Sequence, residues 1–361
     1  SIRSALLSAL FMPLVMALGS ISTALALSRG GSLVFAGAMG FGTLAAFISY
    51  TTQLFDPIQQ LARILAEMQS AQASAERVID LPDTQPDIVD SPEVEAEYGT
   101  AFAPRRGNWP PIAGGVEFRD VTFAYKTGET VLRDFNLKVE PGQTIALVGE
   151  TGAGKSTIVN LVCRFYEPTA GQVLIDGVDY RERSQLWLHS ALGYVLQTPH
   201  LFSGSIADNI RYGRKDATLD EVKRAAAMVR ADRFIAALPD GYGTEVGEGG
   251  GRLSTGQKQL VCFARVVLSD PRIFVLDEAT SSIDTETEQL IQNAIQTVLT
   301  GRTSFIVAHR LSTIRSADKI LVIRGGRITE AGTHDELLEL GGTYARYYEM
   351  QFGPVEQGAV L

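Results

Sequence analysis

The sequence predicts an α/β domain with a mixed sheet, fused to an all-α pair of long apolar helices, and three observations carry this prediction. No charged residue occurs in residues 4–28 or in residues 30–55. From Gly115 onward, beginning with an alternating segment at 116–123, strand-like and helix-like patterns follow one another, as in α/β sheet domains. A glycine-rich stretch at 148–157 lies at a strand-to-helix turn in that second region.

The two uncharged stretches are each long enough to cross a membrane as a helix. At about 1.5 Å per residue, either one spans the ~30 Å hydrocarbon core. Arg29 and the glycines after it indicate a turn, so we expect a transmembrane helical hairpin. A signal peptide explains the sequence less well, because the apolar content is long and doubled and no small-residue cleavage site follows. Two buried helices of a soluble protein are the other alternative, although so many consecutive uncharged positions are unusual outside lipid.

The pattern along the chain divides it into four parts. Beyond Asp56 the apolar residues keep a helical period while polar residues fill the other face, so the second helix is expected to leave the membrane and residues 1–80 to form the membrane part. Residues 81–114 are expected to be a linker without chemistry, acidic in its first half. Its helix-interrupting prolines are Pro82, Pro86, Pro92, Pro104, Pro110 and Pro111. Residues 115–352 form the α/β domain, and residues 353–361 a frayed tail.

Residues 148–157 match the phosphate-loop pattern G-x-x-x-x-G-K-[ST] at every required position. A buried strand at 144–148 precedes the loop, and an amphipathic helix follows it. The glycines let the backbone curl, so that its amide groups and the positive end of the helix hold phosphate oxygens. Lys155 can then reach the β- and γ-phosphates, and the Ser156 hydroxyl can ligate Mg²⁺. The expected ATP-binding residues of the loop are Gly149, Glu150, Thr151, Gly152, Ala153, Gly154, Lys155, Ser156 and Thr157.

A phosphate loop also needs a metal-ordering acid on a neighbouring strand. The apolar segment 273–276 leads directly into Asp277 and Glu278. Asp277 is expected to hold Mg²⁺ through water, and Glu278, displaced from the metal by one position, to polarise the attacking water as general base. A helix cap or a solvated turn is the alternative explanation of an acidic pair at a strand end. Because the acidic pair occurs together with a phosphate loop, a catalytic role is favoured.

Residues 252–257, which precede a helical segment and lie shortly before the acidic strand, resemble the signature motif of the ATP-binding cassette (ABC) transporters. Other motifs of that family fall in family order around them. The matching residues are Tyr125 for the adenine-stacking aromatic, Gln197 for the Q-loop, Asp284 for the D-loop and His309 for the switch histidine. Residues 244–248 are similar to a segment of the exporter branch that contacts the partner's membrane domain.

The resemblance implies a role for each matching residue. Tyr125 is expected to offer its ring to adenine, with packing on the sheet as the alternative. Gln197 suits Mg²⁺ or the attacking water, and otherwise is an ordinary loop amide. His309, which ends a strand at 303–308, is expected to donate a hydrogen bond to the γ-phosphate, at the sheet edge where ligands collect. Asp284 belongs to the same nucleotide-binding set.

The signature residues Ser254, Gly256 and Gln257 are expected to bind phosphate from a second chain. Ser254 is a good N-cap, and the amide end of the helix that it caps can bind an anion. The sequence departs from the family pattern at two positions. Thr255 stands where glycine is usual, so its methyl group could crowd the γ-phosphate, and Gly249 replaces a frequent arginine. Neither change removes a catalytic group, but both are compatible with an ATP site that is weaker than its counterpart in the dimer.

Composition limits the partners. The net charge of −9 and the lack of a long Lys/Arg run argue against a nucleic-acid partner. Cys163 and Cys262 are the two cysteines, each within an apolar helical stretch, so buried free thiols are expected rather than a disulfide or a zinc site. ATP and Mg²⁺ are the expected cofactors.

Taken over the whole chain, the resemblance implies the C-terminal part of an ABC exporter half-transporter. It predicts a helical subdomain inserted between Gln197 and Asp277, further membrane helices upstream, and a second half-transporter as partner in a homodimer or heterodimer. The expected location is a bacterial-type inner membrane with the nucleotide-binding domain in the cytosol, in contact with membrane lipid, and the expected substrate is an unidentified hydrophobic drug, lipid or peptide. A soluble ABC-type ATPase acting on a macromolecule is the main alternative; a small-molecule kinase or an importer ATPase explains fewer motifs.

Overall fold

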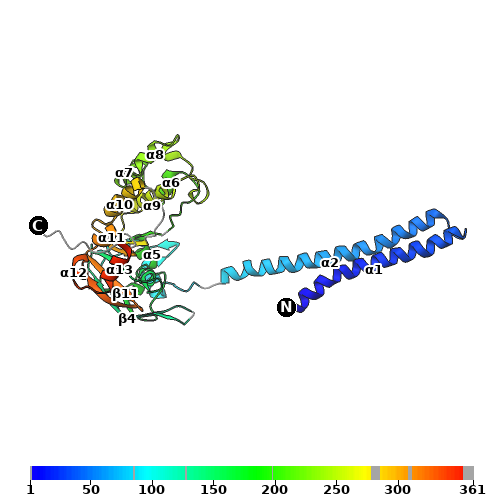
Figure 1. Cartoon of the computed structure of the whole chain (residues 1–361), viewed down its shortest axis with the longest axis horizontal. Coiled ribbons are helices and arrows are strands. Elements are labelled where there is room, and N and C mark those ends of the chain that lie inside the picture. The colour runs from blue at the N-terminus through cyan, green and yellow to red at the C-terminus, as the bar shows by residue number, and fades with distance from the viewer. Residues whose placement is uncertain are drawn as a thin grey trace. The chain divides into compact units, whose positions relative to one another are not determined.

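The computed structural model describes residues 2–83, 86–126, 128–196, 198–277, 285–307 and 311–352. The chain divides into two compact units, Ser1–Asp87 and Ile88–Leu361. The first unit consists of two long helices, and the second holds the β-sheets and the remaining helices (Figure 1).

The first unit is a helical hairpin in which α1 (Ile2–Phe35) and α2 (Phe41–Asp83) lie side by side (Figure 1). A Cβ on Gly30 would lie 2.3 Å from Cδ1 of Leu44, so the missing side chain lets the helices approach closely. The turn that we expected from Arg29 onward is shorter than predicted. Arg29 belongs to α1, and the turn is confined to residues 36–40.

The first helix has the properties of a membrane span. Pro13–Phe35 is the one stretch within the described ranges that is long and apolar enough to cross a membrane as a helix. The start of α2 is uncharged but contains Ser49, Thr51, Thr52 and Gln53, whose polar side chains lower its hydropathy. Apolar side chains lie exposed on both helices, which fits surfaces that face lipid or other helices.

The segment that we expected to be an irregular linker contains regular structure. Helix α2 continues through Pro82, and Pro92 occupies the first position of a further helix, where a missing N–H costs nothing. Ser91 caps that helix by accepting a hydrogen bond from the Val94 amide. The elements are α3 (Pro92–Tyr98), β1 (Gly99–Thr100), β2 (Ala103–Pro104) and a 3₁₀ turn at Arg106–Asn108.

Two larger sheets build the second unit. The six-stranded sheet has the order β12-β11-β5-β10-β9-β8 and is parallel except for β12, which confirms the predicted mixed sheet. Its strands are β5 (Thr144–Val148), β8 (Leu192–Val195), β9 (Ile273–Asp277), β10 (Thr303–Val307), β11 (Lys319–Arg324) and β12 (Arg327–Gly332). The antiparallel sheet β4-β3-β6-β7 consists of β3 (Val116–Ala124), β4 (Thr130–Val139), β6 (Ala170–Ile175) and β7 (Val178–Asp179).

The six-stranded sheet separates two hydrophobic cores. Successive residues of a strand point to opposite faces. Ala146, Leu276 and Ile306 therefore pack with the helices of the inserted subdomain. Their neighbours Ile145, Val275 and Phe305 pack with α4 and the antiparallel sheet. Both faces of the central strands are buried, which is why these strands are apolar along their whole length.

The helices complete the second unit. They are α4 (Lys155–Val162), α5 (Gln185–Ser190), α6 (Ile206–Arg211), α7 (Leu219–Met228), α8 (Asp232–Ala236), α9 (Thr255–Ser269), α10 (Thr285–Leu299), α11 (Leu311–Arg315), α12 (His334–Glu339) and α13 (Thr343–Phe352). Helices α6 to α9 fall between β8 and β9 in the sequence and gather at one end of the unit (Figure 1). This confirms the predicted helical insertion. The predicted tail, residues 353–361, lies outside the described residues.

Candidate nucleotide-binding site

The predicted phosphate loop connects β5 with α4, which begins at Lys155. Gly149, Gly152 and Gly154 have φ angles of +153°, +82° and +105°, a conformation that side chains disfavour. At Gly149 a Cβ would also lie 2.3 Å from the carbonyl oxygen of Ile323, so this position admits no larger residue without a backbone shift. The loop backbone is therefore curled in the way that phosphate binding requires.

The side chain of Lys155 lies within this loop and is 9% exposed. Its Nζ donates hydrogen bonds to the carbonyl oxygens of Gly149 at 2.6 Å and Glu150 at 2.9 Å. Burial lowers the pKa of Lys155, and the charge of Asp277 acts in the opposite direction. Phosphate oxygens carry more negative charge than carbonyl oxygens, so they would bind the ammonium group more strongly than its present acceptors do.

A cavity of about 530 Å³ runs along the loop. Three parts of the domain line it: the loop with the start of α4, the segment from β3 into β4, and the carboxyl ends of β9 and β10. The described lining residues are Tyr125, Glu129, Val131, Thr151, Gly152, Gly154, Lys155, Ser156, Thr157, Asp277 and Val307. Ligands of parallel sheets bind at this edge, beyond the carboxyl ends of the strands.

The two side chains that the sequence predicts as Mg²⁺ ligands, Ser156 and Asp277, both line the cavity. Ser156 is exposed in the first turn of α4, and Asp277 is the last residue of β9. Mg²⁺ prefers oxygen ligands and commonly takes only one or two carboxylates from the protein, with water and phosphate completing its shell. Within the described ranges, His, Cys, Asp and Glu side chains form no group of three that could hold a metal. The available donors therefore fit a metal held jointly with phosphate.

Tyr125 lines the cavity and also packs against two aromatic residues, Phe123 of β3 and Tyr166 of the loop between α4 and β6. Its hydroxyl lies 3.1 Å from Oγ1 of Thr157, and its ring meets Phe123 and Tyr166 edge to face at centroid distances of 4.9 and 5.2 Å. Tyr125 is partly exposed and lines the cavity. Sheet packing and a place beside a nucleotide base are thus compatible for this side chain.

The signature residues form the start of α9 rather than part of this cavity. The Ser254 hydroxyl accepts the Gln257 amide at 3.2 Å, and the Gln257 side chain accepts the Ser254 amide at 3.0 Å, so the two residues form a capping box. Ser254 and Thr255 are exposed, whereas Gly256 is buried. Among the described residues that line the cavity, none comes from 254–257.

The structure places part of the predicted set together. Loop residues, Tyr125 and Asp277 share one cavity, and the start of α9 does not contribute to it. Four further predicted residues, Gln197, Glu278, Asp284 and His309, lie outside the described residues.

Sequence reasoning missed residues that meet the loop from elsewhere. Glu129 and Val131 line the cavity from the hairpin that also carries Tyr125, so their position close behind that aromatic residue was an available signal. Tyr347 of α13 donates a hydrogen bond from its hydroxyl to Oε1 of Glu150 at 3.2 Å. No sequence pattern indicated that contact, because it joins two ends of the domain.

Comparisons with known proteins identify the domain that holds this cavity. Residues 132–281 match the family described as ABC transporter. A fatty acid ABC transporter ATP-binding/permease protein of Mycobacterium bovis is 48% identical over 338 residues, which cover 94% of this chain and 51% of that protein. An ATP-dependent lipid A-core flippase of Desulfotalea psychrophila is 40% identical over 94% of this chain and 57% of its own length.

A solved structure extends the similarity to both units. A bacterial Atm1-family ABC exporter with ATP bound matches 98% of this chain with a TM-score of 0.68 and 37% identity. The match covers 59% of that exporter's chain. The present chain spans about half the length of the curated relatives that it matches.

Proposed function

We propose that this chain, whose residues 132–281 match the ABC transporter family, belongs to an exporter that binds and hydrolyses ATP to move a substrate across a membrane. The curled loop around the buried Lys155, beside a cavity that Ser156 and Asp277 also line, is the observation that carries the proposal. Homology to ATP-binding/permease proteins over 94% of the chain supports it.

The residues of the proposed site form groups that act on different parts of the reaction. MgATP supplies the phosphoryl group that is transferred to water. Lys155 and the loop amides balance the negative charge of the phosphates, and Ser156 and Asp277 hold the metal. Glu278 follows Asp277 directly and takes the proton of the attacking water. The proposed roles of Gln197 and His309, beside the attacking water and the γ-phosphate, come from the family motif.

The proposed substrate is hydrophobic or amphipathic: a lipid, a drug or an apolar peptide. The helix Pro13–Phe35 and the exposed apolar side chains of the hairpin fit a protein that is integral to a membrane. Relatives described as a fatty acid transporter and a lipid A-core flippase come from bacteria. We place the chain in the inner membrane, in contact with lipid, with the nucleotide-binding domain in the cytosol.

A second half-transporter is the proposed partner, in a homodimer or a heterodimer. The start of α9 carries exposed Ser254 and Thr255 but does not line the cavity of its own chain. We infer that Ser254, Gly256 and Gln257 face the nucleotide of the partner, together with Asp284. Closure of two such domains on ATP would move the membrane helices, because nucleotide binding favours the closed state.

Two variants of the full-length protein test this proposal. Glu278→Gln is expected to keep ATP binding and lose steady-state hydrolysis, since the amide keeps the side-chain shape but is not a base. Lys155→Ala is expected to lose nucleotide affinity. Turnover and retained ATP are measured in both variants. Near wild-type turnover in Glu278→Gln would remove its catalytic role, and unchanged affinity in Lys155→Ala would contradict the proposed cradle.

A further inference from the structure

The first residues of the second unit, 88–115, are bound to the rest of that unit at several points, and we call this segment the strap. The Arg183 guanidinium donates to the Tyr98 hydroxyl, and the Trp187 indole N–H donates to the carbonyl oxygen of Pro110 at 2.7 Å. At its end, the carboxylate of Asp176 accepts the amides of Ala113, Gly114 and Gly115 at 2.8, 3.0 and 2.7 Å. The strap is therefore an ordered part of this unit.

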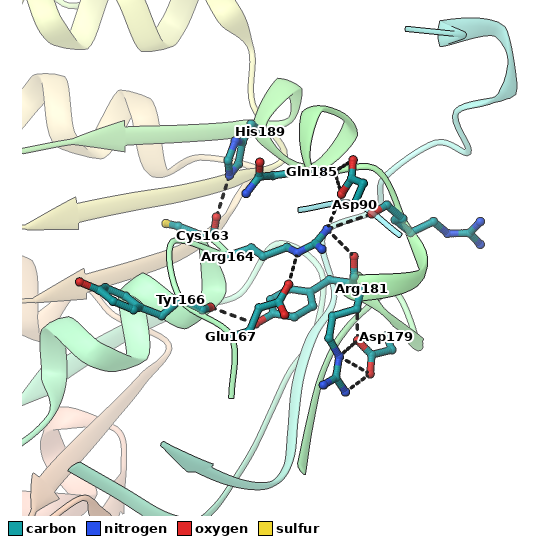
Figure 2. Close-up of polar contacts among 11 residues, drawn as sticks. Asp90, Cys163, Arg164, Tyr166, Glu167, Asp179, Arg181, Gln185 and His189 are labelled. Carbon is teal, nitrogen blue, oxygen red and sulfur yellow. Dashed lines mark hydrogen bonds and ion pairs between the residues drawn. The ribbon is translucent and has the colours of Figure 1, made fainter. Parts of the chain in front are cut away.

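Near the start of the strap, Asp90 pairs with Arg164. Nη1 of Arg164 donates to Oδ1 of Asp90 at 3.0 Å, and both carboxylate oxygens of Asp90 also accept the Gln185 amide at 3.0 Å. The guanidinium group of Arg164 points toward Asp90 and Glu167, while Gln185 approaches Asp90 from the other side (Figure 2).

Arg164 is held in place from all sides. It is 1% exposed, and its remaining acceptors are Glu167 at 2.9 Å and the carbonyl oxygens of Tyr180 and Arg183 at 3.3 and 3.0 Å. Its φ angle of +52° is uncommon for a residue with a side chain. A buried charge needs such a set of partners, and this set leaves Arg164 little freedom to move independently of α4.

Helix α4 connects this pair with the phosphate loop. Its first residues, Lys155 and Ser156, line the nucleotide cavity, and its C-cap is Cys163, directly before Arg164. The helix is about 12 Å long and six of its eight residues are buried in the core. A displacement of the phosphate-binding end of such a short, packed helix must be shared by Arg164.

We propose that the Arg164–Asp90 pair transmits an ATP-driven displacement of the phosphate-binding helix α4 to the strap. The strap in turn transmits the displacement to helix α2, which precedes it in the sequence. Arg164 and Asp90 are positioning residues in this proposal and do not touch nucleotide. The proposal rests on the proposed function, because it requires that ATP moves the membrane helices. The other described fastenings of the strap join it to α5, to Arg183 and to the turn after β6 rather than to α4.

The test uses the full-length protein in lipid nanodiscs with a single introduced cysteine on the hairpin. Cys163 and Cys262 are buried, and the protein without an introduced cysteine measures the background labelling. Ala38→Cys, Ser49→Cys and Gln53→Cys lie at exposed positions. The rate of modification by a maleimide is measured without nucleotide and with MgATP plus vanadate. In the wild-type background, at least one position is expected to change its rate by about threefold or more.

Asp90→Ala removes the ion pair with Arg164, and Asp179→Ala is the matched control. Like Asp90, Asp179 accepts hydrogen bonds from an arginine side chain and from a backbone amide. Both donors belong to Arg181, two residues further along the chain, and its Nη2 lies 2.6 Å from Oδ2 of Asp179 (Figure 2). Asp90→Ala is expected to reduce the nucleotide-dependent rate ratio to near one while ATP affinity stays within about twofold of wild type. Asp179→Ala is expected to keep the wild-type ratio. Glu167 still pairs with Arg164 in Asp90→Ala. If that variant does not fold, Asp90→Asn, which loses the ion pair but keeps an acceptor oxygen, is expected to reduce the ratio part of the way.

The outcomes separate the two proposals. A wild-type protein that hydrolyses ATP but shows no rate change at any of the three positions overturns the proposed export function and the inference with it. A wild-type change that persists in Asp90→Ala, or that disappears equally in Asp179→Ala, overturns the role of the Arg164–Asp90 pair and leaves the export function standing. An ATP affinity lost in proportion to the rate change would show that Asp90 acts only on nucleotide binding, which also contradicts the inference.

Discussion

Lys155 is expected to oppose folding, although in the proposed site it binds phosphate. Because burial lowers its pKa, the folded protein holds this proton less tightly than the unfolded chain, and the site opposes folding below the ordinary pKa of lysine. We expect Lys155→Met to lose ATP affinity and to unfold at a higher temperature than wild type at neutral pH. The difference in unfolding temperature should shrink as the pH rises toward about 10. Calorimetry across that pH range checks both, and a lower unfolding temperature at neutral pH would contradict the expectation.

Local pattern predicted where the loop lies, between a strand and a helix, but not which residues surround it. Gly149, Lys155 and Ser156 occur in one contiguous motif whose spacing follows from the curl of the backbone, so the sequence alone places them. Glu129 reaches the same cavity through hairpin geometry, and Arg164 is buried through contacts with distant segments. An arginine beside an aromatic residue gives no sign in the sequence that it will be buried, because its acceptors come from tertiary structure.

The start of α9 can be tested as an element, because its capping role and its proposed anion-binding role respond differently to substitution. Ser254→Ala removes the cap and is expected to cost about 1 kcal/mol of stability with a modest effect on turnover. Ser254→Asp keeps a good cap but places a negative charge at the helix end. We expect it to remain as stable as wild type and to lose about tenfold or more of the ATPase rate through repulsion of phosphate.

Thermal unfolding and steady-state ATPase of the full-length protein measure both effects. Ser254→Thr, which keeps the hydroxyl cap, serves as the control and should change neither by much. An ATPase rate in Ser254→Asp equal to that of wild type would show that this helix end does not approach phosphate.

Elements defined by apolar runs were predicted more accurately than elements defined by capping. The strand predicted at 144–148 is β5 with the same bounds, because both of its faces are buried. Helix α3 was missed because its first residue, Pro92, was read only as an interruption. Ser91 followed by proline and glutamate is a helix start, and this capping pattern could have been recognised.

At the scale of the whole chain, the strap predicts where the nucleotide-binding unit can be separated. A fragment that begins at Ile88 keeps the pair between Asp90 and the buried Arg164 and the Trp187 bond to Pro110, whereas one that begins at Gly115 loses both. Removing one partner of a fully buried ion pair costs on the order of 3–5 kcal/mol. The cost here is smaller, because Glu167 still pairs with Arg164. We therefore expect the Ile88 fragment to unfold several degrees higher and to bind MgATP without detergent.

The intact chain is the control for that experiment and should require detergent for extraction. If it stays in a high-speed supernatant without detergent, the soluble ATPase replaces the exporter as the better interpretation. If the Gly115 fragment is as stable as the Ile88 fragment, the strap contributes little to the unit.

The assembly itself can be tested with mixed dimers, because the proposed site needs residues from two chains. One Lys155→Ala chain is combined with one Ser254→Arg chain. If each site joins the loop of one chain to the α9 start of the other, both lesions fall into one site and the second site stays intact. We expect measurable ATPase from this mixture, whereas assembly within one chain would damage both sites.

The reciprocal mixture combines one chain that carries both substitutions with one wild-type chain. A two-chain site then receives one lesion on each side, whereas a one-chain site leaves the wild-type chain undamaged. Strict coupling between the sites would lower the activity of both mixtures but would not make the reciprocal one faster. In a homodimer the two mixtures differ only in how the same two substitutions are distributed, so their ATPase rates can be compared directly. A reciprocal mixture that hydrolyses ATP faster than the first would refute the two-chain site.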